Sequence, residues 1–164
     1  MAEPPNIPWD TSLCSASKLR WVEMFELMMT FDGYRWNRYV KPTGEQGEWD
    51  EEKGAYIFNF NDGSGECSCS LCYLVFPLKE SNFHHACLVG GRAKMQPLSG
   101  ESVPKTELTS ALIGSRISKY IKENSKIKIS KRFFALDSKC VLFQLMSRSC
   151  LFDKYTQPRL REIQ

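Results

Sequence analysis

The sequence lacks several features that mark membrane proteins and secreted proteins. No apolar run within its 164 residues approaches the roughly 20 residues that a bilayer-spanning helix needs. The opening segment MAEPPNIPWD has no basic patch followed by an apolar stretch, so we expect no secretory signal. The seven cysteines are odd in number and irregularly spaced, which argues against a disulfide framework. These absences predict an intracellular protein, in the cytoplasm or the nucleus, with reduced cysteines and no membrane partner.

Charge is distributed unevenly along the chain, although the net charge is only +3. Residues 44–66 hold seven acids against one base, whereas residues 104–132 hold eight bases against two acids. A local basic surface suggests an anionic partner such as nucleic acid. A solvated, lysine-rich helix face explains the same pattern equally well.

Hydrophobic periodicity and turn residues predict a mixed α/β fold. We expect three antiparallel strands, a helix that crosses over into a fourth strand, and helices packed against the resulting mixed sheet. Residues 1–54 would form an N-terminal connection with one helix, and residues 55–164 the sheet domain. The expected helices are 11–31, 105–124, 138–147 and 151–164, and the expected strands are 55–62, 69–77, 84–96 and 126–136. In the helix 105–124, the residues expected to form a buried stripe are Ile113, Ile117, Tyr120 and Ile121.

Three acids stand at positions that favour a shared site. Asp62 ends the first expected strand, Glu107 lies in the first turn of the crossover helix, and Asp137 ends the fourth strand. If the first and fourth strands are neighbours, these carboxylates meet at one edge of the sheet. Clustered carboxylates repel one another unless a hard divalent cation neutralises them, and two Mg²⁺ ions about 4 Å apart suit phosphodiester hydrolysis. Each acid alone also has an ordinary role, in a turn or at a helix N-terminus.

The cysteines offer an alternative site. A zinc ion could be held by Cys67, Cys69, Cys72 and Cys87 with His84 or His85. The C-x-C-x₂-C spacing matches no common zinc pattern, and strand alternation places Cys72 on the face opposite to its two neighbours. Nothing places a base beside a particular thiol for nucleophilic catalysis. We therefore favour packing as the role of most cysteines, with zinc left open.

Five segments, in order along nearly the whole chain, carry a family resemblance. They are IPWDTSLCSASKLRWVEMFELM, FNFNDGSGECSCSLCYLV, GGRAKMQPLSGESVPKTELTSALIGSRISKYI, FFALDSKCVLFQL and FDKYTQPRLREIQ. Together they resemble the ribonuclease H-like domain of BEL/Pao-type LTR retroelement polyproteins and the helix that connects it to reverse transcriptase. The resemblance implies a ribonuclease H-like fold with Asp62, Glu107 and Asp137 as three of the acids that bind the catalytic Mg²⁺ or Mn²⁺ ions. The implied activity is hydrolysis of RNA in an RNA–DNA hybrid.

The sequence departs from the family pattern in three places. Pro104-Lys105-Thr106-Glu107 replaces the family's Pro-Arg-Leu-Glu run, so Glu107 stands in a less typical context. Gly63 replaces the alanine that follows the first acid in the family, which we take as a mild change. The chain also stops at Gln164, before the further strand and the Asn-Pro-Ala-Asp segment that supplies the family's fourth acid. This truncation predicts a weakened second metal site. The alternative is a domesticated, inactive module that binds nucleic acid or a protein partner completing the sheet.

Basic residues near the expected site are candidates for substrate contacts. An RNA–DNA hybrid is recognised through its backbone and 2′-hydroxyls, so phosphates would be the targets. The ordinary interpretation of the same residues is that they are solvated and have no binding partner. The aromatic and basic segment YRWNRY, residues 34–39, could stack on bases, but packing is favoured. The residues expected to bind nucleic acid are Arg92, Lys94, Arg116, Lys119 and Lys122.

Overall fold

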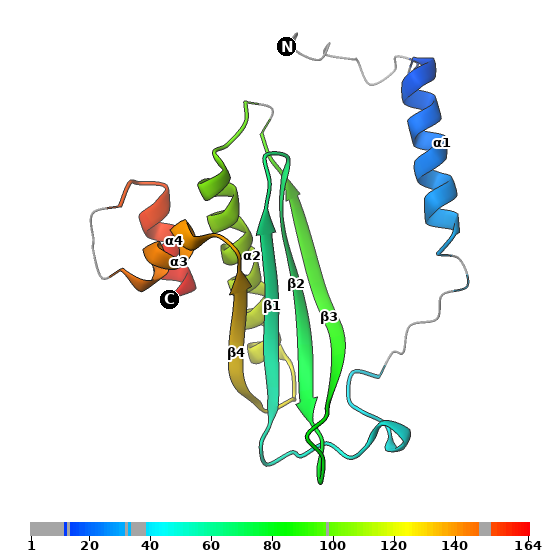
Figure 1. Ribbon diagram of the computed structural model, residues 1–164, viewed down its shortest axis with the longest axis vertical. Helices are drawn as coiled ribbons and strands as arrows, with labels where there is room; N and C mark the ends of the chain where they lie inside the picture. Colours follow the sequence, from blue (N-terminus) through cyan, green and yellow to red (C-terminus); the bar gives the residue numbers. More distant parts are fainter. Residues whose placement is uncertain (1–11, 13, 32, 34–38, 98, 148–151) are drawn as a thin grey trace. The chain divides into compact units, whose positions relative to one another are not determined.

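The chain divides into two compact units, residues 1–38 and 39–164, in the computed structural model (Figure 1). The structure describes residues 12, 14–31, 33, 39–97, 99–147 and 152–164. In the first unit, helix α1 spans Ser15–Met29, within the range expected from the sequence. Most of the segment YRWNRY lies outside the described residues. No described helix is long and apolar enough to cross a bilayer.

The second unit is built on a four-stranded mixed sheet (Figure 1). A short 3₁₀ helix, η1 (Gly44–Gln46), precedes the sheet, whose strands are β1 (Ala55–Gly63), β2 (Cys67–Pro77), β3 (His84–Met95) and β4 (Ile129–Leu136). Their spatial order is β3-β2-β1-β4, and only the β1–β4 pair is parallel. Helix α2 (Val103–Asn124) makes the crossover from β3 to β4. The predicted mixed α/β sheet is confirmed.

Helix α2 covers one face of the sheet, and the main core lies beneath it. The buried apolar residues of this core are Trp49, Ala55, Ile57, Cys72, Leu74 and Phe76, with Ile117 and Ile121 packed against them. The expectation for Tyr120 is wrong, because its side chain is 68% exposed. The buried residues of α2 include small polar side chains, such as Ser110, Ser115 and Ser118, so the apolar stripe of the helix is interrupted.

The close approach of α2 to the sheet depends on Gly114. A Cβ atom at this position would clash with Asn61 Oδ1 and would lie 2.9 Å from Ser70 Oγ. Asn61 itself is buried, and its Nδ2 donates to the Ala135 carbonyl oxygen at 3.1 Å, which joins β1 to β4. The helix, β1 and β4 are thus held together close to the ends of the two parallel strands.

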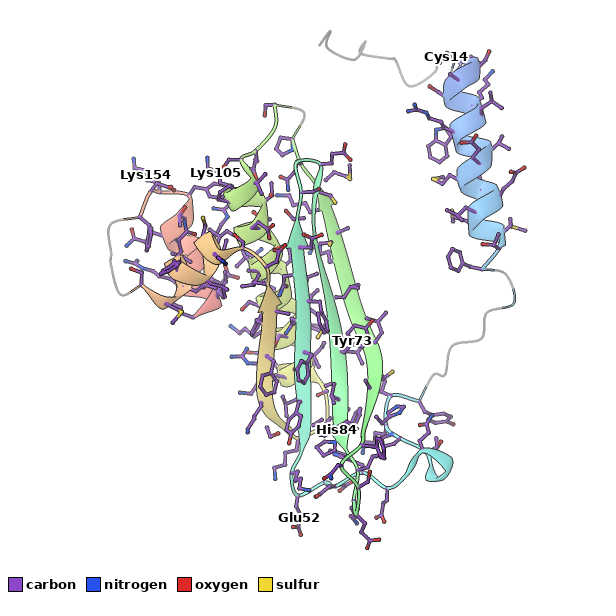
Figure 2. All side chains as sticks on the ribbon, viewed as in Figure 1. Cys14, Glu52, Tyr73, His84, Lys105 and Lys154 are labelled. Carbon is purple, nitrogen blue, oxygen red and sulfur yellow. The ribbon has the colours of Figure 1, made fainter. Side chains whose placement is uncertain are left out.

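The opposite face of the sheet carries aromatic side chains. Phe58 and Phe133 stack with their ring centroids 4.5 Å apart, and Phe60 meets Tyr73 edge-on at 5.8 Å. In Figure 2, the labelled Tyr73 and His84 mark β2 and β3 on this sheet. Strand alternation directs the side chain of Asp62 to this same face.

Two short helices complete the second unit. Helix α3 (Lys139–Met146) begins after Ser138, whose side chain accepts a hydrogen bond from the Val141 N–H at 3.4 Å. Helix α4 (Thr156–Ile163) packs against α2. A second core cluster joins these helices through Leu108, Ala111, Val141 and Leu160.

Candidate metal centre

Three carboxylates from three elements meet at one end of the sheet. Asn61 pairs with Leu136 in the parallel β1–β4 ladder, so the next residues, Asp62 and Asp137, are neighbours at the same strand ends. Glu107 reaches them from the first turns of α2. One oxygen of each carboxylate lies within 4.8 Å of one oxygen of each of the other two. The structure therefore brings together the three acids that the sequence singled out.

The backbone around Gly63 sets the position of Glu107. A Cβ atom on Gly63 would lie 2.5 Å from both the Glu107 nitrogen and the Thr106 carbonyl carbon, so the end of β1 touches the α2 backbone directly. The Ser68 hydroxyl also links β2 to α2, because it donates to the Thr106 carbonyl oxygen at 2.9 Å. The replacement of the family's alanine by Gly63 is therefore not mild here, because the structure has no room for a methyl group.

The three acids differ in their exposure and electrostatics. Glu107 is only 6% exposed, whereas Asp62 and Asp137 are exposed to solvent. Burial raises the pKa of Glu107, and the charges of Asp137 and then Asp62 raise it further, while the Gly63 N–H acts in the opposite direction. Glu107 Oε2 is buried and has no hydrogen-bond partner among the described residues. A buried, unpartnered carboxylate oxygen facing two exposed carboxylates fits the oxygen donor set of a hard divalent cation.

The raised pKa of Glu107 predicts that the metal-free protein loses folding stability as the pH rises. A carboxyl group whose folded-state pKa is raised contributes stability that is present below its unfolded pKa, about 4.3, and is lost as pH rises through the folded value. In EDTA, Glu107→Gln should therefore be more stable than the wild type at pH 7, by roughly 0.5–2 kcal/mol. The difference should disappear near pH 4. Urea unfolding at both pH values measures this.

Glu66→Gln is the matched control for that experiment, because Glu66 is exposed in the β1–β2 turn outside the cluster. This variant should have the same free energy of unfolding as the wild type at both pH values. A Glu107→Gln protein with no stability gain at neutral pH would show that the carboxylates do not repel one another as the geometry requires.

The five expected nucleic-acid contacts fall into two groups. Arg92, Lys94 and Arg116 line one groove, whereas Lys119 and Lys122 are exposed on α2 outside its lining. The groove also contains Arg159 of α4, which the sequence did not single out. Its proline-containing helix carried no signal that would have linked it to strand β3 or to α2.

The cysteines do not form a metal site in the part of the chain that the structure describes. There, the only group of three or more His, Cys, Asp or Glu residues with suitably close donor atoms is the carboxylate cluster. Burial raises the pKa of Cys72 to about 11, and burial followed by the charge of Asp62 raises that of Cys69. These thiols are poorly ionised near neutral pH, which supports a packing role for them.

Comparisons with known proteins agree with this geometry. The family model for the Pao retrotransposon-like RNaseH-like domain matches residues 3–138. Among solved structures, RNase H1 from the halophilic archaeon Halobacterium salinarum NRC-1 is similar at 13% identity and a TM-score of 0.37, over 66% of this chain and 74% of that chain. At this identity and TM-score, the structural similarity adds nothing to the family match. The comparison with curated proteins gave no match. Because the family model spans most of the sequence, the chain belongs to the family of Pao retrotransposon-like RNase H-like domains.

Proposed function

We propose that this domain is a metal-dependent nuclease that hydrolyses the RNA strand of an RNA–DNA hybrid. The observation that carries the proposal is the convergence of Asp62, Glu107 and Asp137 within 4.8 Å, in a chain of a ribonuclease H-like family. Carboxylates at such separations repel one another, and a divalent cation would turn this repulsion into binding.

The three carboxylates would hold Mg²⁺ or Mn²⁺ in a two-ion site. When bound, the ions supply activation of the attacking water and stabilisation of the leaving 3′-oxygen. Glu107 would act as the fixed ligand, because its backbone is packed against Gly63. Asp62 and Asp137, which are exposed, would present their carboxylates on the solvent side where a substrate strand can approach.

Substrate selection would depend on the backbone of the hybrid. Proteins recognise such duplexes through shape, phosphates and 2′-hydroxyls rather than through sequence. Lys119 and Lys122 are exposed on α2 and would add long-range attraction. Arg92 and Lys94 project from β3 on the α2 side of the sheet, and they would contact phosphates of the backbone.

Cleavage of an end-labelled RNA strand tests the proposal. With Mg²⁺ or Mn²⁺, the wild-type protein should cut the RNA internally in an RNA–DNA hybrid and leave a DNA duplex of the same sequence intact. EDTA should abolish the cleavage. A protein that is folded by circular dichroism but does not cut the hybrid with either metal would overturn the nuclease proposal and favour a binding module on the same scaffold.

A further inference from the structure

A chain of hydrogen bonds joins the end of β3 to the first turns of α2, and it passes through the Ser68 hydroxyl on β2. Ser68 is fully buried and donates to the Thr106 carbonyl oxygen at 2.9 Å. The Ser68 oxygen itself accepts a hydrogen bond from Gln96 Nε2 at 2.7 Å. Gln96 follows β3, and its backbone N–H donates to the Glu66 carbonyl oxygen at 2.8 Å. The segments that this chain connects lie at the same end of the sheet (Figure 1).

The Thr106 carbonyl group belongs to the peptide unit that carries Glu107. A peptide unit is planar, so fixing the Thr106 oxygen also restricts the nitrogen and Cα of Glu107. Gly63 packs against the same unit, because a Cβ atom there would lie 2.7 Å from the Thr106 oxygen and 2.5 Å from the Glu107 nitrogen. The position of the Glu107 side chain therefore depends on a peptide unit that is held by a glycine contact and by the Ser68 hydroxyl.

Gln96 sets the direction of the hydrogen bond that Ser68 makes. A serine hydroxyl has one proton to donate and two lone pairs that accept. Because the Gln96 amide nitrogen donates to the Ser68 oxygen, the Ser68 proton goes to the Thr106 carbonyl oxygen. An acceptor in place of that amide would compete for the same proton. Successive hydrogen bonds in one direction also strengthen one another in a buried site.

Ser70 shows that a buried serine on β2 does not by itself make this link. It is two residues further along the strand, so its side chain lies on the same face of the sheet as that of Ser68. Ser70 is equally buried, but its hydroxyl has no hydrogen-bond partner among the described residues. The link to α2 is therefore specific to Ser68, and Ser70 provides a matched control.

We propose that Ser68 and Gln96 are positioning residues of the metal centre. They hold the peptide unit between Thr106 and Glu107, so that the Glu107 carboxylate stays within reach of the other two carboxylates of the cluster. The inference rests on the metal site of the proposed function, and it adds two residues that are not ligands themselves.

The affinity for Mn²⁺, measured by calorimetry without substrate, tests the role of Ser68. Loss of hydrogen bonds that orient metal ligands typically lowers metal affinity by about 10–100-fold. Because Ser68 acts through the backbone, we expect the lower end of this range, about 10-fold, for Ser68→Ala. Ser70→Ala also loses one buried hydroxyl, but it should bind Mn²⁺ as the wild type does. Ser68→Cys, which keeps a weak donor, should recover part of the affinity.

Gln96→Glu tests the direction of the hydrogen-bond chain. An ionised carboxylate cannot donate, and it would compete with Thr106 for the Ser68 proton. We therefore expect weaker Mn²⁺ binding than in the wild type. The added negative charge alone would have the opposite effect, because it attracts the cation. Binding of Mn²⁺ by Gln96→Glu as tightly as by the wild type, or more tightly, would overturn the role of Gln96.

The outcomes separate the positioning role from the nuclease activity. Equal Mn²⁺ affinities of folded Ser68→Ala and Ser70→Ala would overturn the positioning role and leave the nuclease proposal intact. Mn²⁺ binding that is weakened in Ser68→Ala, in a protein that does not cleave the hybrid, would support the positioning role and remove the nuclease proposal alone. Absence of Mn²⁺ binding by the folded wild type would overturn the positioning role together with the metal centre.

Discussion

Replacement of Gly63 by alanine is expected to lower both the stability of the domain and its nuclease activity. The new Cβ atom would lie 2.5 Å from backbone atoms of Thr106 and Glu107. Backbone atoms, unlike the end of a flexible side chain, cannot rotate out of the way. The start of α2 must therefore move. Overpacking of this kind costs about 1–3 kcal/mol in the free energy of unfolding.

The effect of Gly63→Ala on activity should be larger than its effect on folding suggests. A shift of α2 moves Glu107 away from Asp62 and Asp137, and a displacement of about 1 Å in a catalytic group can cost about 100-fold in rate. Urea unfolding and cleavage of the labelled hybrid measure the two effects separately.

Gly65→Ala is the matched control in the same hairpin. A Cβ atom on Gly65 would meet nothing within 4 Å, so this variant should keep wild-type stability and activity. If Gly63→Ala behaved like Gly65→Ala, the contact between β1 and α2 would not set the position of Glu107, and that part of the account would be wrong.

The carboxylate cluster could be anticipated because its geometry follows from local signals. Asp62 lies at the end of one strand and Asp137 directly after another, and the carboxyl ends of two parallel neighbouring strands meet at the same edge of a sheet. Glu107 lies in the first turns of the helix that joins them, so it starts near that edge. Only the pairing of the first and fourth strands had to be assumed, and the structure has this pairing.

The features that sequence reasoning missed depend on contacts between distant segments. Tyr120 was expected to be buried because it fits a helical stripe, but the helix approaches the sheet through Gly114 instead. The ion pair between Arg116 and Glu162 joins residues 46 positions apart, and no periodicity encodes it. The same holds for Arg159, whose place in the groove depends on how α4 packs on α2.

Asp62→Asn and Asp137→Asn are expected to have the largest effect on activity. Asparagine has nearly the same shape as aspartate but removes the charge that a hard cation requires. Loss of metal-based stabilisation worth several kcal/mol corresponds to a fall of at least about 100-fold in the rate of cleavage. Both residues are exposed and both raise the pKa of Glu107, so removing either charge should relieve repulsion in the metal-free protein. The variants should therefore be at least as stable as the wild type in EDTA.

The most direct measurement is the Mg²⁺-dependent cleavage rate of the labelled hybrid for the wild type, Asp62→Asn and Asp137→Asn, with Glu66→Gln as the control acid outside the cluster. We expect the two aspartate variants to be folded and inactive, and Glu66→Gln to cleave at the wild-type rate. Wild-type cleavage by either aspartate variant would contradict the claim that the three carboxylates form the metal centre of a nuclease.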